Sequence, residues 1–184
     1  MKPTLVLFFH PNWEKSRTNR RLVAEASKVE GVTFRDVYEH YPDFAIDVEA
    51  EQALLLEHEV VVFHHPLYWY SCPPLMKQYL DLVLSHGWAY GTKGTKLEGK
   101  QWQQVVTTGG PTSAYQAEGM NHHTLEEFLY PFEQTASLCR MLWRAPFAVQ
   151  GTHRMQPAEL ETHATLYRGL LTSLVATPQE VTHE

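Results

Sequence analysis

Along the chain, short runs of apolar and β-branched residues alternate with segments in which apolar residues recur at helical spacing. The runs predict five strands, at residues 4–9, 32–38, 60–65, 103–110 and 146–151. Between them, the first predicted helix carries Leu22, Val23, Ala26 and Val29 at three- and four-residue spacings and ends at Gly31. Further helices are expected at residues 47–59, from residue 74 through 83, beyond Pro131 within residues 128–141, and at residues 157–174.

Strands that alternate with helices are typical of a parallel sheet covered on both faces. Five such units in 184 residues predict a doubly wound α/β sheet with strand order 2-1-3-4-5, in a single domain of residues 1–184. Right-handed crossovers place ligands at the carboxyl ends of the strands, beside the switch between the first and third. We therefore expect the loops after Phe9, Phe63 and Val106 to converge on one site.

Composition and charge narrow the class of protein. Hydrophobic residues make up 43% and charged residues 20%, which fits a soluble globular chain. No apolar run approaches the ~18 residues of a membrane span, and the start of the chain is interpreted as a strand rather than a signal peptide. The net charge of -6 argues against a generic nucleic-acid binder. Cys72 and Cys139 lie far apart and form no CxxC pair, so reduced cytosolic thiols are expected, with a disulfide as the alternative.

The first loop, residues 10–21, lacks both the GxGxxG and the GxxxxGK[ST] fingerprint of nucleotide-binding loops. Ser16, Thr18 and Asn19 nevertheless lie at the start of the predicted helix. Their hydroxyl and amide groups, together with free backbone N–H groups and the positive helix end, favour a phosphate. Plain N-capping by Ser16 is the alternative, and the residues alone favour it.

The loops after the third and fourth strands offer flat surfaces and close backbone approach. Residues 67–70 supply broad apolar area that can border a planar ring, although packing in the core or in a subunit interface is the alternative. Residues 107–110 end in two glycines, which let a backbone approach a flat ligand or simply form a tight turn.

Adjacent His64 and His65 resemble a pair of metal ligands. However, neighbours on a strand point to opposite faces, and no Cys, His or carboxylate partner stands at ligand spacing, so no metal is expected. The chain also lacks GxSxG, and neither cysteine has an activating histidine beside it in the sequence, which argues against a nucleophilic hydrolase.

Six segments of the chain form a recognisable set: HP at residue 10, SRTN at 16–19, YPDFAID at 41–47, HPLYWYSCPPLMKQYLD at 65–81, SHGWAYG at 85–91 and TTGG at 107–110. The fourth and fifth of these are specific, whereas TTGG alone would be weak. Together they resemble the flavodoxin-like NAD(P)H:quinone oxidoreductases, and in particular the ancillary proteins of glutathione-regulated potassium-efflux antiporters in Gram-negative bacteria. The resemblance covers about residues 4–175 and implies a flavodoxin-like doubly wound fold.

The resemblance implies bound flavin mononucleotide (FMN). By similarity, its phosphate and ribityl chain would be held by His10, Ser16, Arg17, Thr18 and Asn19, and its isoalloxazine ring bordered by Leu67, Tyr68, Trp69, Tyr70, Thr107, Thr108, Gly109 and Gly110. In the broader family, a tyrosine soon after TTGG and a histidine six residues beyond it assist charge changes on the flavin. Tyr115 matches the tyrosine, but Asn121 occupies the place of the histidine and His122 comes one position late, so only Tyr115 is carried over as catalytic.

Members of this family are homodimers with sites near the subunit interface, and they pass a hydride from NAD(P)H through the flavin to quinones. The resemblance therefore implies a cytoplasmic quinone reductase that also docks on the cytoplasmic domain of a potassium/proton antiporter at the inner membrane. A purely regulatory subunit with little catalysis is the alternative. An electron-transfer flavodoxin fits less well, because flavodoxins usually have a shorter phosphate loop and stronger acidity than -6.

Overall fold

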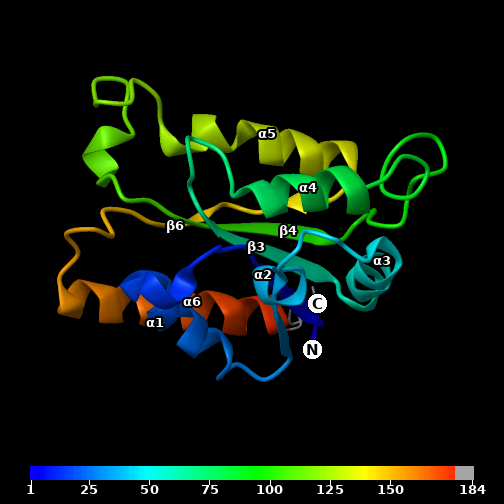
Figure 1. Ribbon diagram of the computed structural model, residues 1–184, viewed down its shortest axis with the longest axis horizontal. Coiled ribbons are helices and arrows are strands. Elements are labelled where there is room, and N and C mark those ends of the chain that lie inside the picture. Colours follow the sequence, from blue (N-terminus) through cyan, green and yellow to red (C-terminus); the bar gives the residue numbers. More distant parts are fainter. Residues whose placement is uncertain (177–184) are drawn as a thin grey trace, which may run out of the picture.

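A parallel sheet lies between two layers of helices in the computed structural model, which describes residues 1–176 (Figure 1). Strands β1 (Thr4–Phe8), β2 (Val32–Asp36), β3 (Val60–Pro66), β4 (Gln101–Thr107) and β5 (Leu142–Trp143) follow the order β2-β1-β3-β4-β5, and β6 (Phe147–Val149) also pairs with β4. The predicted strand order is therefore confirmed. The predicted domain extends to residue 184, and its residues 177–184 lie outside the described part of the chain.

Three strands differ from the prediction. The fourth was predicted at residues 103–110 but runs over Gln101–Thr107, so the two glycines lie in the loop after it. The second ends at Asp36 rather than Tyr38, because the Asp36 carboxylate accepts hydrogen bonds from the Tyr38 and Glu39 N–H groups and starts the short helix α2 (Val37–His40). The fifth strand was predicted at residues 146–151, where β6 lies, but the short strand β5 before it, which also pairs with β4, was not predicted. Pro146 lies between them and has no N–H to donate to the ladder, so the strand is interrupted there.

The helices cover the two faces of the sheet separately. Helices α1 (Arg17–Ala26) and α6 (Pro157–Val175) pack on one face, and α3 (Val48–Glu57), α4 (Pro74–Val83) and α5 (Leu125–Leu138) pack on the other (Figure 1). Alternation along β3 serves both layers, since Val60 and Val62 face α1 and α6 while Val61 and Phe63 face the opposite layer. Among residues 1–176, no helix is both long and apolar enough to cross a membrane.

Two helix boundaries also differ from the prediction. Helix α1 ends at Ala26, so Val29 lies in the following turn, where Gly31 adopts a φ of 85°. Helix α5 begins six residues before Pro131, because Thr124 and Glu127 form a reciprocal capping box that starts the helix at Leu125. The Thr-x-x-Glu signal of this box is present in the sequence, and the helix continues through Pro131.

A buried carboxylate, Glu51 on α3, ties the edge of the sheet to the helices. Its side chain has no exposed surface and forms an ion pair with Arg35 of β2. The Tyr41 hydroxyl donates to Glu51 Oε1 at 2.7 Å, and the Tyr79 hydroxyl of α4 donates to Oε2 at 3.1 Å. Because a buried charge is costly unless it is paired, the placement of these elements depends on all three partners.

We predict that Arg35→Met lowers the free energy of unfolding by about 3 kcal/mol, because it leaves the Glu51 carboxylate buried without its cation. The matched control is Lys77→Met, which removes an ion pair to Asp81 whose two side chains are both exposed and should cost about 0.5 kcal/mol or less. Urea unfolding of the two variants measures the difference. Equal losses would show that the buried pair has no special structural role.

Candidate functional site

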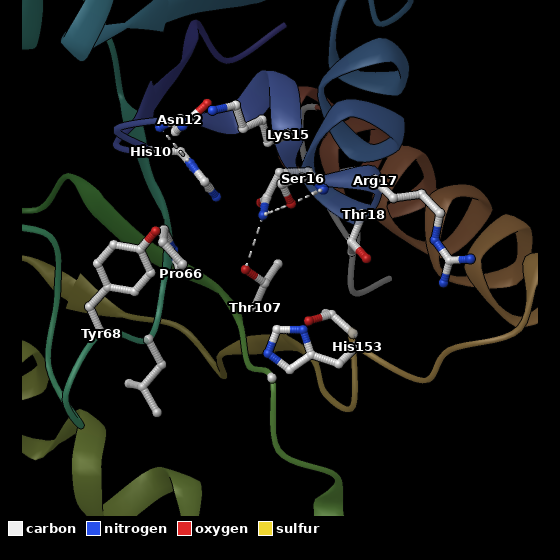
Figure 2. A pocket seen from close by; sticks show the side chains of 14 residues that line it. His10, Asn12, Lys15, Ser16, Arg17, Thr18, Pro66, Tyr68, Thr107 and His153 are labelled. Atoms are coloured by element: carbon white, nitrogen blue, oxygen red, sulfur yellow. Dashed lines mark hydrogen bonds between the residues drawn. The ribbon is translucent and has the colours of Figure 1, made fainter.

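The loops that follow β1, β3 and β4 converge on a cavity of about 570 Å³, which we call the main cavity (Figure 2). The parallel register brings these strand ends together, since Phe8 pairs with His64 and Pro66 pairs with Thr107. The lining residues are His10, Asn12, Lys15, Ser16, Arg17, Thr18, Asn19, Pro66, Leu67, Tyr68, Thr107, Gly109, Thr152 and His153. Three of the converging loops were predicted.

The fourth contribution to the main cavity comes from the loop after β6. Thr152 and His153 were not predicted as site residues, although the loop leaves the carboxyl end of a parallel strand and so obeys the same rule as the other three. A Cβ on Gly109 would lie 2.4 Å from the His153 ring nitrogen Nε2. The His153 ring therefore lies directly over the Gly109 backbone, a contact that the sequence alone does not reveal.

The charge of the main cavity is opposite to that of the whole chain. Its lining includes the cations Lys15 and Arg17 and no Asp or Glu, in a protein of net charge -6. Figure 2 shows that the Arg17 side chain extends away from the cavity, and its guanidinium donates to the Met155 carbonyl. Arg17 therefore contributes mainly its backbone N–H at the start of α1. An anion is the chemical group that this lining favours.

Ser16 caps α1 as the sequence predicts, and its hydroxyl still has a hydrogen to donate. Ser16 Oγ accepts from the Asn19 backbone N–H, with 3.2 Å between the heavy atoms, and from Asn19 Nδ2 at 2.9 Å. Both lone pairs are thus used, and only the O–H remains available for another partner. The first N–H groups of a helix, here those of Arg17 and Thr18, also lack intrahelical acceptors. Capping and anion binding are therefore compatible.

The His10 ring offers a hydrogen-bond donor although it is uncharged. The ring is buried, and burial lowers its pKa to about 4, so the imidazole is neutral at physiological pH. Its Nδ1 accepts from the Asn12 backbone N–H at 3.1 Å, which leaves the proton of the neutral ring on Nε2. Figure 2 shows the ring directed toward the space between Ser16 and Pro66.

His64 and His65 point to opposite faces of the sheet, and each ring nitrogen has a partner in the protein. On the α6 side, His64 Nε2 donates to Asn19 Oδ1 at 3.1 Å, and Nδ1 accepts from the Tyr167 hydroxyl at 3.2 Å. On the other side, His65 Nδ1 donates to the Pro66 carbonyl, and Nε2 accepts from Gln104 Nε2. Burial lowers the pKa of His64 to about 3 and that of His65 to about 4. Within residues 1–176, no group of three potential metal ligands comes together.

A second, smaller cavity of about 230 Å³, which we call the aromatic cavity, shares Leu67 with the main cavity. Trp69 and Tyr70 hold left-handed φ values of 50° and 62° between Tyr68 and Ser71, whose N–H donates to the Tyr68 carbonyl at 3.0 Å. Bulky residues rarely adopt this conformation, and it costs on the order of 1 kcal/mol or more per residue. The turn leaves Trp69 93% exposed at the edge of this cavity.

The other predicted site residues either line the aromatic cavity or hold the loop after β4 in place. Gly110 and Tyr115 line the aromatic cavity, together with Asn121, which accepts from the Tyr70 hydroxyl at 3.3 Å. Burial raises the pKa of Tyr115. Thr108 is buried and lines neither cavity; its hydroxyl donates to the Gly110 carbonyl at 2.8 Å and braces the loop.

Comparison with known proteins identifies relatives over nearly the whole chain. Residues 2–170 match the model of a family described as flavodoxin-like fold. The glutathione-regulated potassium-efflux system ancillary protein KefG of Serratia proteamaculans is 50% identical over 163 residues, which are 89% of this chain and 89% of that protein.

Solved structures of high similarity carry different functional descriptions. A structure described as a thermophilic tryptophan halogenase from Streptomycin violaceusniger is 47% identical, with a TM-score of 0.89 over 91% of this chain and 97% of that one. General stress protein 14 of Treponema denticola, in complex with FMN, is 38% identical, with a TM-score of 0.89 over 93% and 98%. An NADPH-quinone reductase of P. pentosaceus is 31% identical, with a TM-score of 0.84 over 92% and 97%. Function must therefore be argued from the site.

We predict that stability falls as the pH drops from about 6.5 to about 4. The folded protein keeps His10, His64 and His65 neutral in this range, whereas the unfolded chain takes up protons at the usual histidine pKa of 6.5. Each histidine contributes a slope of about 1.4 kcal/mol per pH unit. Urea unfolding at several pH values gives the slope of the free energy of unfolding against pH. This slope should be smaller by that amount in His65→Gln than in the wild type.

The matched control for this prediction is His123→Gln, which replaces an exposed histidine near the start of α5. If His65→Gln and His123→Gln have the same slope as the wild type, burial of neutral His65 does not govern the acid sensitivity.

Proposed function

This chain belongs to the family of flavodoxin-like fold, and we propose that it binds FMN and transfers a hydride from NAD(P)H to a quinone. One observation carries the proposal: a cavity with Lys15, neutral donors and no carboxylate lies at the switch between β1 and β3, beside an aromatic cavity. A ligand that joins a phosphate to a planar ring fits both, because the main cavity offers donors to an anion and the aromatic cavity offers a flat apolar surface.

The phosphate end would be held by groups that donate hydrogen bonds. Ser16 offers its O–H, His10 offers Nε2–H, and the first turn of α1 offers backbone N–H groups at the positive end of a ten-residue helix. Lys15 adds a positive charge at the rim. These donors are already held by other bonds, so little reorganisation is needed when an anion arrives.

The ring end would be bordered by residues 67–70 and by Gly109 and Gly110. The Leu67 N–H is tied to the Thr107 carbonyl at 2.8 Å, so the loops after β3 and β4 form one rigid wall. Bound FMN would supply the chemistry that accepts and donates hydride. The chain's own part is to hold the ring, to exclude water with Tyr68 and Trp69, and to offer the Tyr115 hydroxyl as a proton donor near the ring edge.

The wider proposal concerns assembly and location. Trp69 is almost fully exposed at the rim of the aromatic cavity, and a second copy of the chain in a homodimer would cover it. The similarity to KefG supports a cytoplasmic protein that reaches the inner membrane through a potassium-efflux partner.

The visible absorption spectrum of the purified protein after addition of FMN tests the proposed function. Flavin bands that co-purify with the protein and bleach on addition of NADPH, followed by recovery with a quinone, are expected. A protein that stays colourless and oxidises no NADPH in the presence of a quinone would refute the proposal.

A second candidate is a regulatory subunit with little catalysis, which the 50% identity to an ancillary protein favours. It would bind the antiporter's cytoplasmic domain and change potassium efflux even when hydride transfer is abolished. Efflux from vesicles that contain the antiporter separates the two candidates, if Tyr115→Phe is compared with the wild type. Full activation by a variant that oxidises no NADPH supports regulation, and loss of both supports a catalytic role.

We predict that Asn19→Asp weakens FMN binding by at least about tenfold, because a negative charge then lies beside the expected phosphate position. A carboxylate also cannot donate to Ser16 Oγ or Thr107 Oγ1, as the amide does now. The dissociation constant is measured by quenching of flavin fluorescence. The control Gln134→Glu makes the same change in net charge on the exposed surface of α5 and should leave the constant unchanged. Equal affinities in both variants would mean that this loop does not hold the phosphate.

A further inference from the structure

A chain of buried hydrogen bonds connects the core of the protein to the main cavity. It begins at Tyr167 on α6, passes through His64 on β3 to Asn19 on α1, and ends at the hydroxyls of Ser16 and Thr107. Tyr167 and His64 have no exposed surface, and Asn19 is 3% exposed. Neither Tyr167 nor His64 lines the main cavity.

The direction of donation along this chain follows from Tyr167. Within the described residues, its hydroxyl bonds only to His64 Nδ1, at 3.2 Å, so its hydrogen is satisfied only if Tyr167 donates to that nitrogen. His64 must then carry its single proton on Nε2, which donates to Asn19 Oδ1. The Asn19 amide is thereby oriented with its NH₂ group toward Ser16 Oγ at 2.9 Å and Thr107 Oγ1 at 3.3 Å.

If the hydrogen bonds were donated in the opposite direction, the cavity would present acceptors instead of donors. If His64 carried its proton on Nδ1, Nε2 would accept from Asn19, and the amide oxygen would face Ser16 and Thr107. Ser16 and Thr107 would then donate inward and present lone pairs to the cavity. In that arrangement, the Tyr167 hydrogen would also remain buried without an acceptor, which is unfavourable.

We infer that Tyr167 and His64 are positioning residues for anion recognition: they fix the Asn19 amide so that Ser16 and Thr107 present O–H donors to a phosphate. All bonds in the chain point from the core to the cavity, so each donor also polarises the next. The inference rests on the proposed function for the identity of the phosphate ligand, but the donor pattern follows from the protein's own hydrogen bonds. Neither residue touches the ligand, and their effect passes through Asn19.

The test compares FMN with riboflavin, which has the same ring and ribityl chain but no phosphate. In Tyr167→Phe, the direction of donation is no longer fixed, and FMN affinity should fall by about fivefold. Riboflavin affinity should stay unchanged. The matched control is Tyr79→Phe, which also removes a fully buried hydroxyl, on the opposite face of the sheet, and should keep the wild-type ratio of the two affinities. Thermal unfolding verifies that each variant is folded.

A second variant tests whether the effect of Tyr167 passes through His64. His64→Phe interrupts the chain at its middle, so adding Tyr167→Phe to it should not change the FMN-to-riboflavin ratio further. If Tyr167→Phe keeps the wild-type ratio, or weakens both flavins equally as a merely structural change would, the inference is wrong.

A phosphate titration tests the donor chain even if the proposed function is wrong. If the wild type binds neither flavin, the same variants are titrated with inorganic phosphate, followed through the amide NMR shifts of Arg17 and Thr18. A phosphate affinity about fivefold lower in Tyr167→Phe supports the donor chain without any flavin. Equal affinity in both proteins, or no response in the wild type, overturns it.

Discussion

The side-chain amide of Asn19 must satisfy its hydrogen bonds without water, and the geometry of the site depends on this constraint. The amide contacts the cap of α1 through Ser16, the end of β4 through Thr107 and the end of β3 through His64. A buried amide that loses a partner costs about 1–3 kcal/mol, so three separate elements are held at fixed positions around one residue. The main cavity is the space that these elements enclose, together with the first loop.

Electrostatics explains why the cavity suits an anion in an acidic protein. The carboxylates of Glu25 and Glu51 are buried in ion pairs away from the cavity, whereas its lining has none. His10 and His64 are held neutral by burial and serve as directed donors instead of charges. A neutral donor array costs less to bury than a cluster of cations, and it still selects an acceptor-rich ligand.

Much of this arrangement could be predicted from the sequence, because alternating strands and helices fix the sheet order and the edge at which ligands bind. Ser16 was correctly predicted as an N-cap, and residues 10, 16–19, 67–68, 107 and 109 do line one cavity. The sequence could not reveal contacts that depend on tertiary geometry, such as His153 against Gly109 or Tyr167 against His64, which lie 44 and 103 residues apart. Strand β5 could not be predicted because its two residues, Leu142 and Trp143, are too few to show an alternating pattern, and Pro146 separates them from β6.

The central claim is that neutral donors and a helix N-terminus bind the phosphate of FMN. The phosphorus NMR signal of FMN added to the protein tests it most directly, because a free phosphate monoester changes its charge near pH 6. We expect a separate bound signal whose position stays at the dianion value from about pH 8 down to about pH 6, since the donor array stabilises the higher charge. A bound signal that titrates as free FMN does, or the absence of any bound signal, would contradict the account.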